Sequence, residues 1–220
     1  MKLVDSLEEQ ELLEALIETT KPPLPPECRH LNWLLAAPFR YEPPYPVGSR
    51  FRRHGRTPGV FYAAEQVATA VAELAFYRQL FFAESPTTPW PANPAEYTAF
   101  SVLYATDHAI DLTEPPFDAL KDIWTHPTDY TPCQALADAA RTAGVGVIRY
   151  TSVRDPARGC NIALLTALAF AAAEAQDHQT WRIHLGAHGV MAVAEFPAHR
   201  LAFGRNAFPD PRLADMRWER

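Results

Sequence analysis

Prolines interrupt this chain from end to end and limit the length of every regular element it can form. The sequence holds 21 prolines against 9 glycines, and that proline share is roughly double the usual one. Because proline ends helices and lacks the N–H that a central strand needs, we expect short elements framed by rigid, irregular loops. The densest proline cluster, at residues 22–26, predicts a boundary between an N-terminal helix with a linker, residues 1–30, and a domain over residues 31–220.

The N-terminal segment carries the pattern of an amphipathic helix. Leucine and isoleucine recur at helical spacing over residues 3–19 in an acidic background, and the pattern stops at Lys21 and Pro22. The acidic face is either simply solvated or packed against another chain. The segment could therefore serve a homo-oligomer or a contact with a protein partner.

Residues 31–220 mix helix and strand patterns without a strict βαβ rhythm. Helical patterns cover residues 65–82, 115–123 and 132–143, and strand patterns cover residues 60–63, 97–106, 145–150, 161–165, 180–185 and 190–196, the last two as a hairpin. Residues 167–175 are alanine-rich and fit either state. The irregular order favours a single α+β domain over a doubly wound sheet. The chain has no P-loop and no GxGxxG segment, so a nucleotide would not be held by a Walker or Rossmann device.

Composition and charge narrow the function classes. A chain of 220 residues with 48% hydrophobic residues is long enough for one globular domain with its own core. Its net charge of −6 argues against direct nucleic-acid binding, which draws on a basic surface. No apolar run approaches the roughly 20 residues that span a bilayer, and residues 1–16 are acidic where a signal peptide is basic and apolar. We therefore expect a soluble cytoplasmic protein that binds neither a membrane nor a nucleic acid directly.

The placement of cysteines and histidines predicts neither a disulfide framework nor a metal centre. The 3 cysteines are scattered without a CxxC pair. His178, His184 and His188 lie in a stretch that reads as strand and turn, with no acids at ligand spacing.

One carboxylate stands out, at Glu73 within the helical pattern of residues 65–82. It shares its face with Thr69 one turn before and with Phe76 and Tyr77 one turn after, so we expect it to be partly shielded from solvent. A shielded carboxylate is costly unless it has a cationic partner or a functional role. An ion pair with an arginine that only orders a loop is the alternative to a role in chemistry.

Four segments, in this order along the chain, resemble the core of the RES domain, a family named for its arginine, glutamate and serine. They are Gly-Ser-Arg-Phe at residues 48–51, Gly-Val-Phe-Tyr at 59–62, Thr-Ala-Val-Ala-Glu at 69–73, and Tyr-Thr-Ser-Val-Arg-Asp at 150–155 with Gly-Cys-Asn at 159–161. The resemblance covers residues 31–170 and implies a fold like that of the ADP-ribosyltransferases.

The resemblance implies that the protein binds NAD, and three arginines are candidates for binding its pyrophosphate. The resemblance implies that Arg50 is the family arginine, because a glycine and an aromatic residue flank it, whereas Arg52 matches better by its distance to Tyr62. Arg40 resembles the arginine that opens the family domain, or is an exposed loop arginine. A guanidinium suits this role because its planar donors match phosphate oxygens.

The other family positions fall on four residues. Glu73 matches the glutamate, and a carboxylate near the anomeric carbon would stabilise the positive charge that departing nicotinamide leaves on the ribose. Tyr62 would offer its ring to nicotinamide or hold a ribose hydroxyl, or is a core aromatic. Ser152 matches the serine and lacks a triad around it, so hydrogen bonding to ribose or phosphate is expected rather than nucleophilic attack. Asn161 would add an amide contact, or caps a turn.

The RES resemblance implies an NAD-consuming enzyme in which NAD is the substrate and no cofactor is needed. The nicotinamide–ribose bond would be cleaved by phosphorolysis or hydrolysis, depleting NAD and arresting growth, or ADP-ribose would pass to a host protein. A non-catalytic binding module on the same fold is the alternative from another class. The family also implies a toxin with an Xre-type antitoxin protein as its partner. Arg154, Asp155 and Arg158 next to Ser152 are expected to form a lid or a solvated loop.

Overall fold

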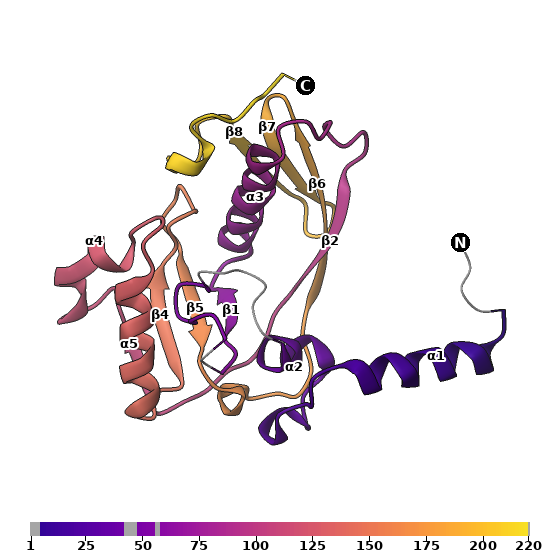
Figure 1. Ribbon diagram of the computed structural model, residues 1–220. Coiled ribbons are helices and arrows are strands. Elements are labelled where there is room, and N and C mark those ends of the chain that lie inside the picture. Colours follow the sequence, from indigo (N-terminus) through magenta and orange to yellow (C-terminus); the bar gives the residue numbers. More distant parts are fainter. Residues whose placement is uncertain (1–4, 42–47, 56–57, 220) are drawn as a thin grey trace.

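The computed structural model describes residues 5–41, 48–55 and 58–219. Within these ranges two four-stranded sheets, ordered β1-β5-β4-β3 and β2-β6-β7-β8, have helices packed against them (Figure 1). The helices are α1 (Leu7–Thr20), α2 (Trp33–Arg40), α3 (Val67–Glu84), α4 (Lys121–Trp124) and α5 (Thr131–Thr142). The strands are β1 (Phe61–Ala64), β2 (Ala95–Phe100), β3 (Ala109–Asp111), β4 (Val147–Thr151), β5 (Cys160–Leu164), β6 (His178–Gly186), β7 (Gly189–Ala194) and β8 (His199–Gly204). The predicted single α+β domain is confirmed.

The first sheet is covered on both faces. β5 pairs antiparallel with β1 and with β4, and β3 runs parallel to β4. Because side chains alternate along a strand, Val147, Ile162 and Leu164 point to the face covered by α2, whereas Ile148 and Ala163 point to the face covered by α5. Burial on both faces explains why neighbouring residues are both apolar at 147–148 in β4 and at 162–164 in β5, instead of alternating with polar ones.

The ends and the buried side of α5 follow from its local sequence. Pro132 lies in the first turn, where the missing N–H removes no hydrogen bond. Cys133, Ala137 and Ala140 recur at helical spacing and face the sheet. Gly144 then adopts a φ of 75°, the left-handed conformation that commonly ends a helix.

The second sheet is an antiparallel meander of β6, β7 and β8, with β2 beside β6. Trp181, Ile183 and Leu185 alternate along β6 and are buried against α3. α3 contributes the small side chains of Ala72 and Ala75 to this contact, and these let the helix approach the sheet closely. Since α3 begins directly after β1, it connects the two sheets, and its first turns lie beside the first sheet (Figure 1). The predicted hairpin over residues 180–196 is confirmed by the β6–β7 pairing.

Several elements differ from the sequence-based expectation. α2 was not predicted because Pro38 lies inside it and prolines surround it, whereas Asn32 caps its first turn by accepting a hydrogen bond from Leu34 N. β3 and β8 were also missed, since β3 is very short and β8 is a mostly exposed edge strand with little apolar alternation. The predicted strand over residues 97–106 ends at Phe100, beyond which the chain leaves the sheet.

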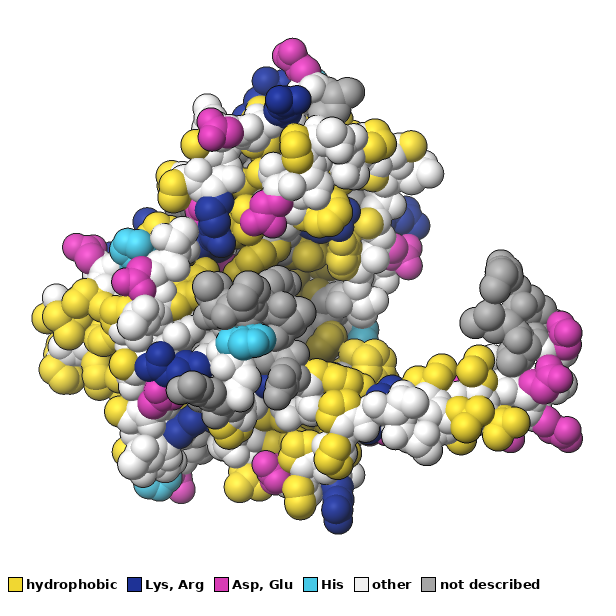
Figure 2. All heavy atoms as spheres, viewed as in Figure 1, with side chains coloured by type: hydrophobic (Ala, Val, Ile, Leu, Met, Phe, Trp, Pro, Cys, Tyr) yellow, Lys and Arg dark blue, Asp and Glu magenta, His cyan; other side chains and the backbone are white. Residues whose placement is uncertain are grey.

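α1 stands away from the rest of the molecule (Figures 1 and 2). It buries none of its residues, and Leu7, Leu12 and Leu16 are 82%, 61% and 56% exposed. Its contact with the body includes an ion pair of 2.6 Å between Glu18 and Arg40 Nη1. The first residue of the predicted helical pattern, Leu3, lies outside the described residues. No helix in the described ranges is long and apolar enough to cross a membrane.

Candidate active site

The first sheet delivers four polar side chains to the face that α5 covers. In its register Tyr62 lies opposite Ala163, and Asn161 lies opposite both Ala64 and Tyr150. Residues that face each other across a ladder share a side of the sheet, and so do residues two apart on one strand. Tyr62, Tyr150 and Asn161 therefore lie on one side, and Ser152, two residues beyond Tyr150, continues that row.

α3 brings Glu73 to this row. Glu73 Oε1 accepts a hydrogen bond of 2.7 Å from Ser152 Oγ and a second of 2.7 Å from Asn161 Nδ2. Glu73 Oε2 makes no hydrogen bond within the described part of the chain and is not closed off from solvent. No lysine or arginine of the described ranges lies within ion-pairing distance of Glu73, so the alternative of a loop-ordering ion pair is not what the structure shows. One oxygen is thus anchored by two neutral donors, and the other is open.

The Ser152 hydroxyl can point its proton in only one direction. Ser152 Oγ accepts hydrogen bonds from the backbone N of Arg154, at 3.2 Å, and of Asp155, at 2.9 Å. With both lone pairs occupied, the hydroxyl proton must go to Glu73. Ser152 was predicted to hydrogen-bond ribose or phosphate, and that stays a prediction; within the chain its hydroxyl donates to Glu73.

The hydroxyl of Tyr62 is bonded within the protein, whereas its ring is partly accessible. Its hydroxyl lies 2.9 Å from Ser49 Oγ and accepts a hydrogen bond of 2.9 Å from Phe51 N. Enclosure of the hydroxyl raises the pKa of Tyr62, although the residue as a whole is 37% exposed. The hydroxyl is therefore occupied by the loop before β1, and the ring is the part that can meet a ligand.

The loop held by Tyr62 makes a turn that requires a glycine. Gly48 adopts a φ of 71°, and a β-carbon there would lie 2.2 Å from Arg52 O. Ser49 and Arg52 close the turn through reciprocal backbone hydrogen bonds of 2.8 and 3.2 Å. The glycine in the Gly-Ser-Arg-Phe segment is thus explained by backbone geometry.

Arg50 is buried and bonded to the protein rather than aimed at open space. Its Nη1 donates to Trp124 O at 2.7 Å, and its Nη2 donates to His126 O at 3.1 Å. The guanidinium also stacks on the ring of Tyr130, 4.8 Å from the centroid. Arg50 is 8% exposed and forms no hydrogen bond or ion pair with Glu73 in the described part of the chain. In this structure it fixes the turn between α4 and α5.

Arg40 and Arg52 do not join the group around Glu73 through any contact. Arg40 Nε donates to Pro22 O at 2.6 Å and its Nη1 pairs with Glu18, which secures α1. Arg52 Nη2 donates to Tyr41 O at 2.8 Å, at the end of α2. Arg40 is therefore not a free loop arginine, and both residues hold the N-terminal part of the molecule in place.

The order of these residues in the chain is matched by a protein-family model. The model described as RES domain matches residues 24–186, well over half of the chain. The chain belongs to the RES-domain family. RES domains are associated with NAD-related enzymatic activity. No curated protein matches the chain. The match starts inside the predicted linker and ends with β6. β7, β8 and the C-terminal segment, residues 205–219, therefore lie beyond it.

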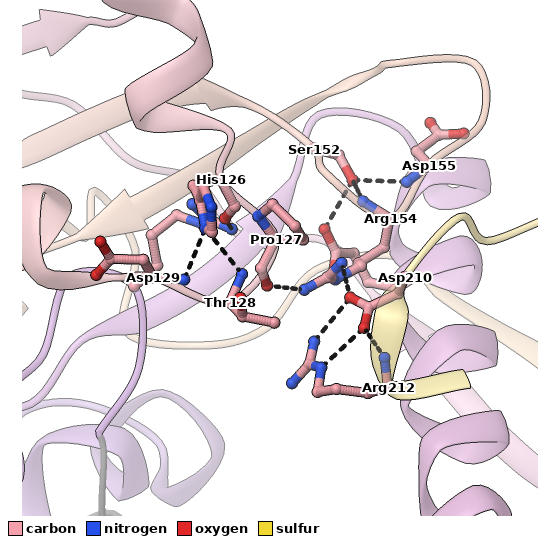
Figure 3. Close-up of polar contacts among 11 residues, drawn as sticks. His126, Pro127, Thr128, Asp129, Ser152, Arg154, Asp155, Asp210 and Arg212 are labelled. Carbon is pink, nitrogen blue, oxygen red and sulfur yellow. Dashed lines mark hydrogen bonds and ion pairs between the residues drawn. The ribbon is translucent and has the colours of Figure 1, made fainter. Parts of the chain in front are cut away.

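The loop after Ser152 in this RES domain, expected to be a lid or a solvated loop, is exposed at Arg158 but not at Arg154 and Asp155. Arg154 and Asp155 are only 5% and 7% exposed. Arg154 pairs with Asp210 and donates to Pro127 O, which ties the loop to the α4–α5 turn and to the C-terminal segment (Figure 3). Asp155 Oδ2 accepts a hydrogen bond of 2.7 Å from Thr69 Oγ1 of α3. The solvated reading is wrong for Arg154 and Asp155 because these two residues, whose types usually mark surface loops, here meet buried partners from distant segments.

Asp210 supplies the negative charge that pairs with Arg154 and so links the loop to the C-terminal segment. Burial opposes the charge of its carboxylate, but hydrogen bonds from Arg212 and the positive charges of Arg154 and Arg212 outweigh burial and lower the pKa of Asp210. The Asp210 side chain is 1% exposed. Because it lies beyond the matched region, nothing in the RES segments points to it.

Tyr77 and Tyr130 complete the surroundings of Glu73 and were not predicted as site residues. Burial raises the pKa of Tyr77, and the nearby Tyr130 and Glu73 raise it further. Tyr77 is nevertheless 49% exposed as a residue, so part of its side chain is open to solvent. Tyr77 was recognisable as a neighbour of Glu73 from its helical spacing, whereas Tyr130 carried no signal of its own.

A small hollow of about 110 Å³ lies beside the group rather than within it. It is lined by the α4–α5 turn, the loop after Ser152 and residues 208–210, and Glu73 is not among its lining residues. Pockets for organic ligands usually measure about 300–1,000 Å³. This hollow is therefore too small for a dinucleotide, and Glu73 remains the better guide to the chemistry.

Proposed function

We propose that this RES domain is an NAD-consuming toxin that cleaves the bond between nicotinamide and ribose. One observation carries the proposal: Glu73 keeps one carboxylate oxygen open while two neutral donors, Ser152 and Asn161, hold the other. Neutral donors orient a carboxylate without cancelling its charge. An oriented anion with a free oxygen is what a reaction that develops positive charge requires.

In the proposed reaction the bond between the ribose anomeric carbon and the nicotinamide nitrogen breaks. Its electron pair goes to nicotinamide, whose ring loses its positive charge, and the charge passes to the ribose in an oxocarbenium-like transition state. Glu73 Oε2 stabilises that charge. An acceptor oxygen then bonds to the anomeric carbon, and where the acceptor is water one proton is released.

The other predicted residues take supporting roles. Ser152 and Asn161 are positioning residues for Glu73, and the open ring face of Tyr62 is a surface on which the nicotinamide ring can stack. Arg50 positions the α4–α5 turn through its two carbonyl contacts. Arg40 and Arg52 were predicted to bind NAD. In this proposal they do not touch the substrate but hold the N-terminal segment in place.

The test of the reaction is to incubate the purified chain with NAD and to separate the products. Three arms differ in their acceptor: buffer alone, buffer with inorganic phosphate, and buffer with a lysate of host protein. Free ADP-ribose identifies hydrolysis, ADP-ribose 1″-phosphate identifies phosphorolysis, and a mass increase on a protein identifies transfer. Absence of nicotinamide from all three arms, with the chain folded, contradicts the proposed function and favours a binding module.

The proposal extends to a protein partner, an antitoxin of the Xre type. A toxin that consumes NAD must be neutralised in the cell that makes it, so expression of the chain alone should arrest growth and co-expression of the antitoxin should restore it. Growth arrest that persists after Glu73→Gln substitution would show that the toxicity does not come from this site.

A further inference from the structure

A dinucleotide carries a negatively charged pyrophosphate, which calls for a cationic partner in the protein. Arg50 donates to two carbonyl groups of the α4–α5 turn, and Arg40 is paired with Glu18. The proposed function therefore needs a positive group near Glu73 that is not already committed to the protein.

The C-terminal segment supplies an excess positive charge. Arg154 and Arg212 share the single carboxylate of Asp210, so the three side chains carry a net charge of +1. Arg154 and Asp210 are 5% and 1% exposed, whereas Arg212 is 31% exposed. Arg212 is thus the member of the trio through which the excess charge faces outward.

The guanidinium of Arg212 has donors to spare. Its Nε donates to Asp210 Oδ1 at 2.9 Å and its Nη2 donates to Asp210 Oδ2 at 3.0 Å (Figure 3). A guanidinium has five N–H donors in a fixed plane. The Nη1 group makes no hydrogen bond within the described ranges, and with the second proton of Nη2 it forms a free edge. Such an edge matches two phosphate oxygens.

Arg212 lies on the same side of α3 as Tyr77. Arg212 and Arg154 both contact the ring of Phe76, at 5.2 and 4.1 Å from its centroid, and the Tyr77 ring meets Phe76 edge to face at 5.2 Å. Arg154, which shares Asp210 with Arg212, donates to Pro127 O in the turn just before Tyr130. The cation and the two phenols therefore lie in one region of the molecule, and Tyr77 lies one turn after Glu73 on α3.

Tyr130 is held firmly in that neighbourhood. Arg50 stacks on its ring, and the turn before it is closed by His126 Nδ1, which accepts hydrogen bonds from the backbone N of Thr128 and Asp129 at 3.3 and 2.8 Å (Figure 3). A fixed phenol loses little freedom on binding a ligand, which favours its use in recognition.

We propose that Arg212, Tyr77 and Tyr130 form the subsite for the diphosphate of the dinucleotide. The free edge of Arg212 binds the phosphate oxygens, and the two tyrosine hydroxyls donate to phosphate or ribose oxygens. This inference rests on the proposed function, because it assigns the part of the substrate that Glu73 does not touch. It makes the segment beyond the RES match a part of the site.

ADP is the probe for the subsite, because it carries the diphosphate without the bond that is cleaved. Isothermal titration of ADP into the full chain should show binding that weakens about 10- to 100-fold in Arg212→Gln, as expected when one charge-assisted contact is lost. Arg200→Gln removes the same charge from the exposed edge strand β8 and should bind ADP like the wild type. Arg212→Lys keeps the positive charge but loses the paired N–H donors of the guanidinium. Its affinity for ADP should lie between those of Arg212→Gln and the wild type.

The outcomes separate this inference from the proposed function. If ADP does not bind, or binds equally to Arg212→Gln and wild type, the subsite is overturned. If ADP binding depends on Arg212 while NAD yields no nicotinamide, the subsite is supported and the proposed cleavage of NAD is contradicted. With an active enzyme, Arg212→Gln should raise KM for NAD about 10- to 100-fold with kcat changed less than about threefold. A loss confined to kcat contradicts the inference.

Discussion

Replacing Glu73 by glutamine removes one charge from the site and changes little else. Both observed hydrogen bonds, from Ser152 Oγ and Asn161 Nδ2, end on the same oxygen. A glutamine can keep its carbonyl oxygen in that place and put its NH2 group where Oε2 was. The substitution is therefore nearly isosteric, and it converts the open oxygen from an anion into a neutral donor.

The expected fall in kcat follows from the loss of this negative charge. A unit charge about 4 Å from a developing positive charge contributes about 4 kcal/mol at an effective dielectric constant of ~20, and only about 1 kcal/mol in bulk water. Glu73 is half-buried against α3 neighbours, so the larger value applies. At about 1.4 kcal/mol for each factor of ten, kcat should fall about 1,000-fold.

The cost to stability is smaller. Each of the two hydrogen bonds weakens by about 1 kcal/mol when its acceptor loses its charge, and relief from shielding an unpaired charge offsets part of that loss. We expect the free energy of unfolding to change by less than about 2 kcal/mol, measured by urea denaturation. Nicotinamide release is followed in parallel by chromatography.

Glu84→Gln is the matched control, because it removes the same charge from the exposed end of the same helix. It should leave both activity and stability unchanged. A folded Glu73→Gln protein that retains more than a tenth of wild-type kcat would refute the assigned role of the carboxylate.

Other substitutions test other parts of the structure. Ser152→Ala leaves Glu73 held only by the Asn161 amide, and kcat should fall about 10- to 100-fold with KM for NAD little changed. Asp210→Asn leaves buried Arg154 without its counter-charge and should lower the free energy of unfolding by about 3–5 kcal/mol in urea titrations. In the wild type the lowered pKa of Asp210 contributes stability above about pH 4 that is lost as pH falls further, and acid unfolding curves of Asp210→Asn should lack that contribution. Deletion of residues 1–20 should leave the melting temperature within about 3 °C of that of the full chain. Deletion of residues 1–30 also removes the buried Cys28 and should lower the melting temperature by more.

The fold class, and Glu73 and Ser152 as candidate site residues, were accessible from sequence for identifiable reasons. α3 and α5 carry helical spacing over several turns, and β4 and β5 carry apolar runs, so local patterning sufficed. Glu73 and Ser152 were found through the order of the RES segments. That the two share a hydrogen bond depends on how α3 packs beside the end of β4, which the segments do not contain.

The parts that sequence reasoning missed depend on contacts between distant segments. Arg154 reads as a surface residue until Asp210, 56 positions later, is placed against it. Arg50 has the features of a substrate-binding arginine, and its carbonyl partners belong to a turn whose path no local pattern reveals. α2 was missed because the penalty for an internal proline was weighed without the tertiary packing that offsets it.

The most direct measurement of the central claim is a proton NMR time course of NAD with the purified chain. Cleavage predicts that the nicotinamide ring signals move to those of the free base while the signal of the adjoining anomeric proton disappears at the same rate. The Glu73→Gln protein should need about 1,000 times longer to reach the same conversion. A spectrum of NAD that stays unchanged with folded wild-type protein, in the presence and absence of phosphate and of a protein acceptor, would contradict the claim.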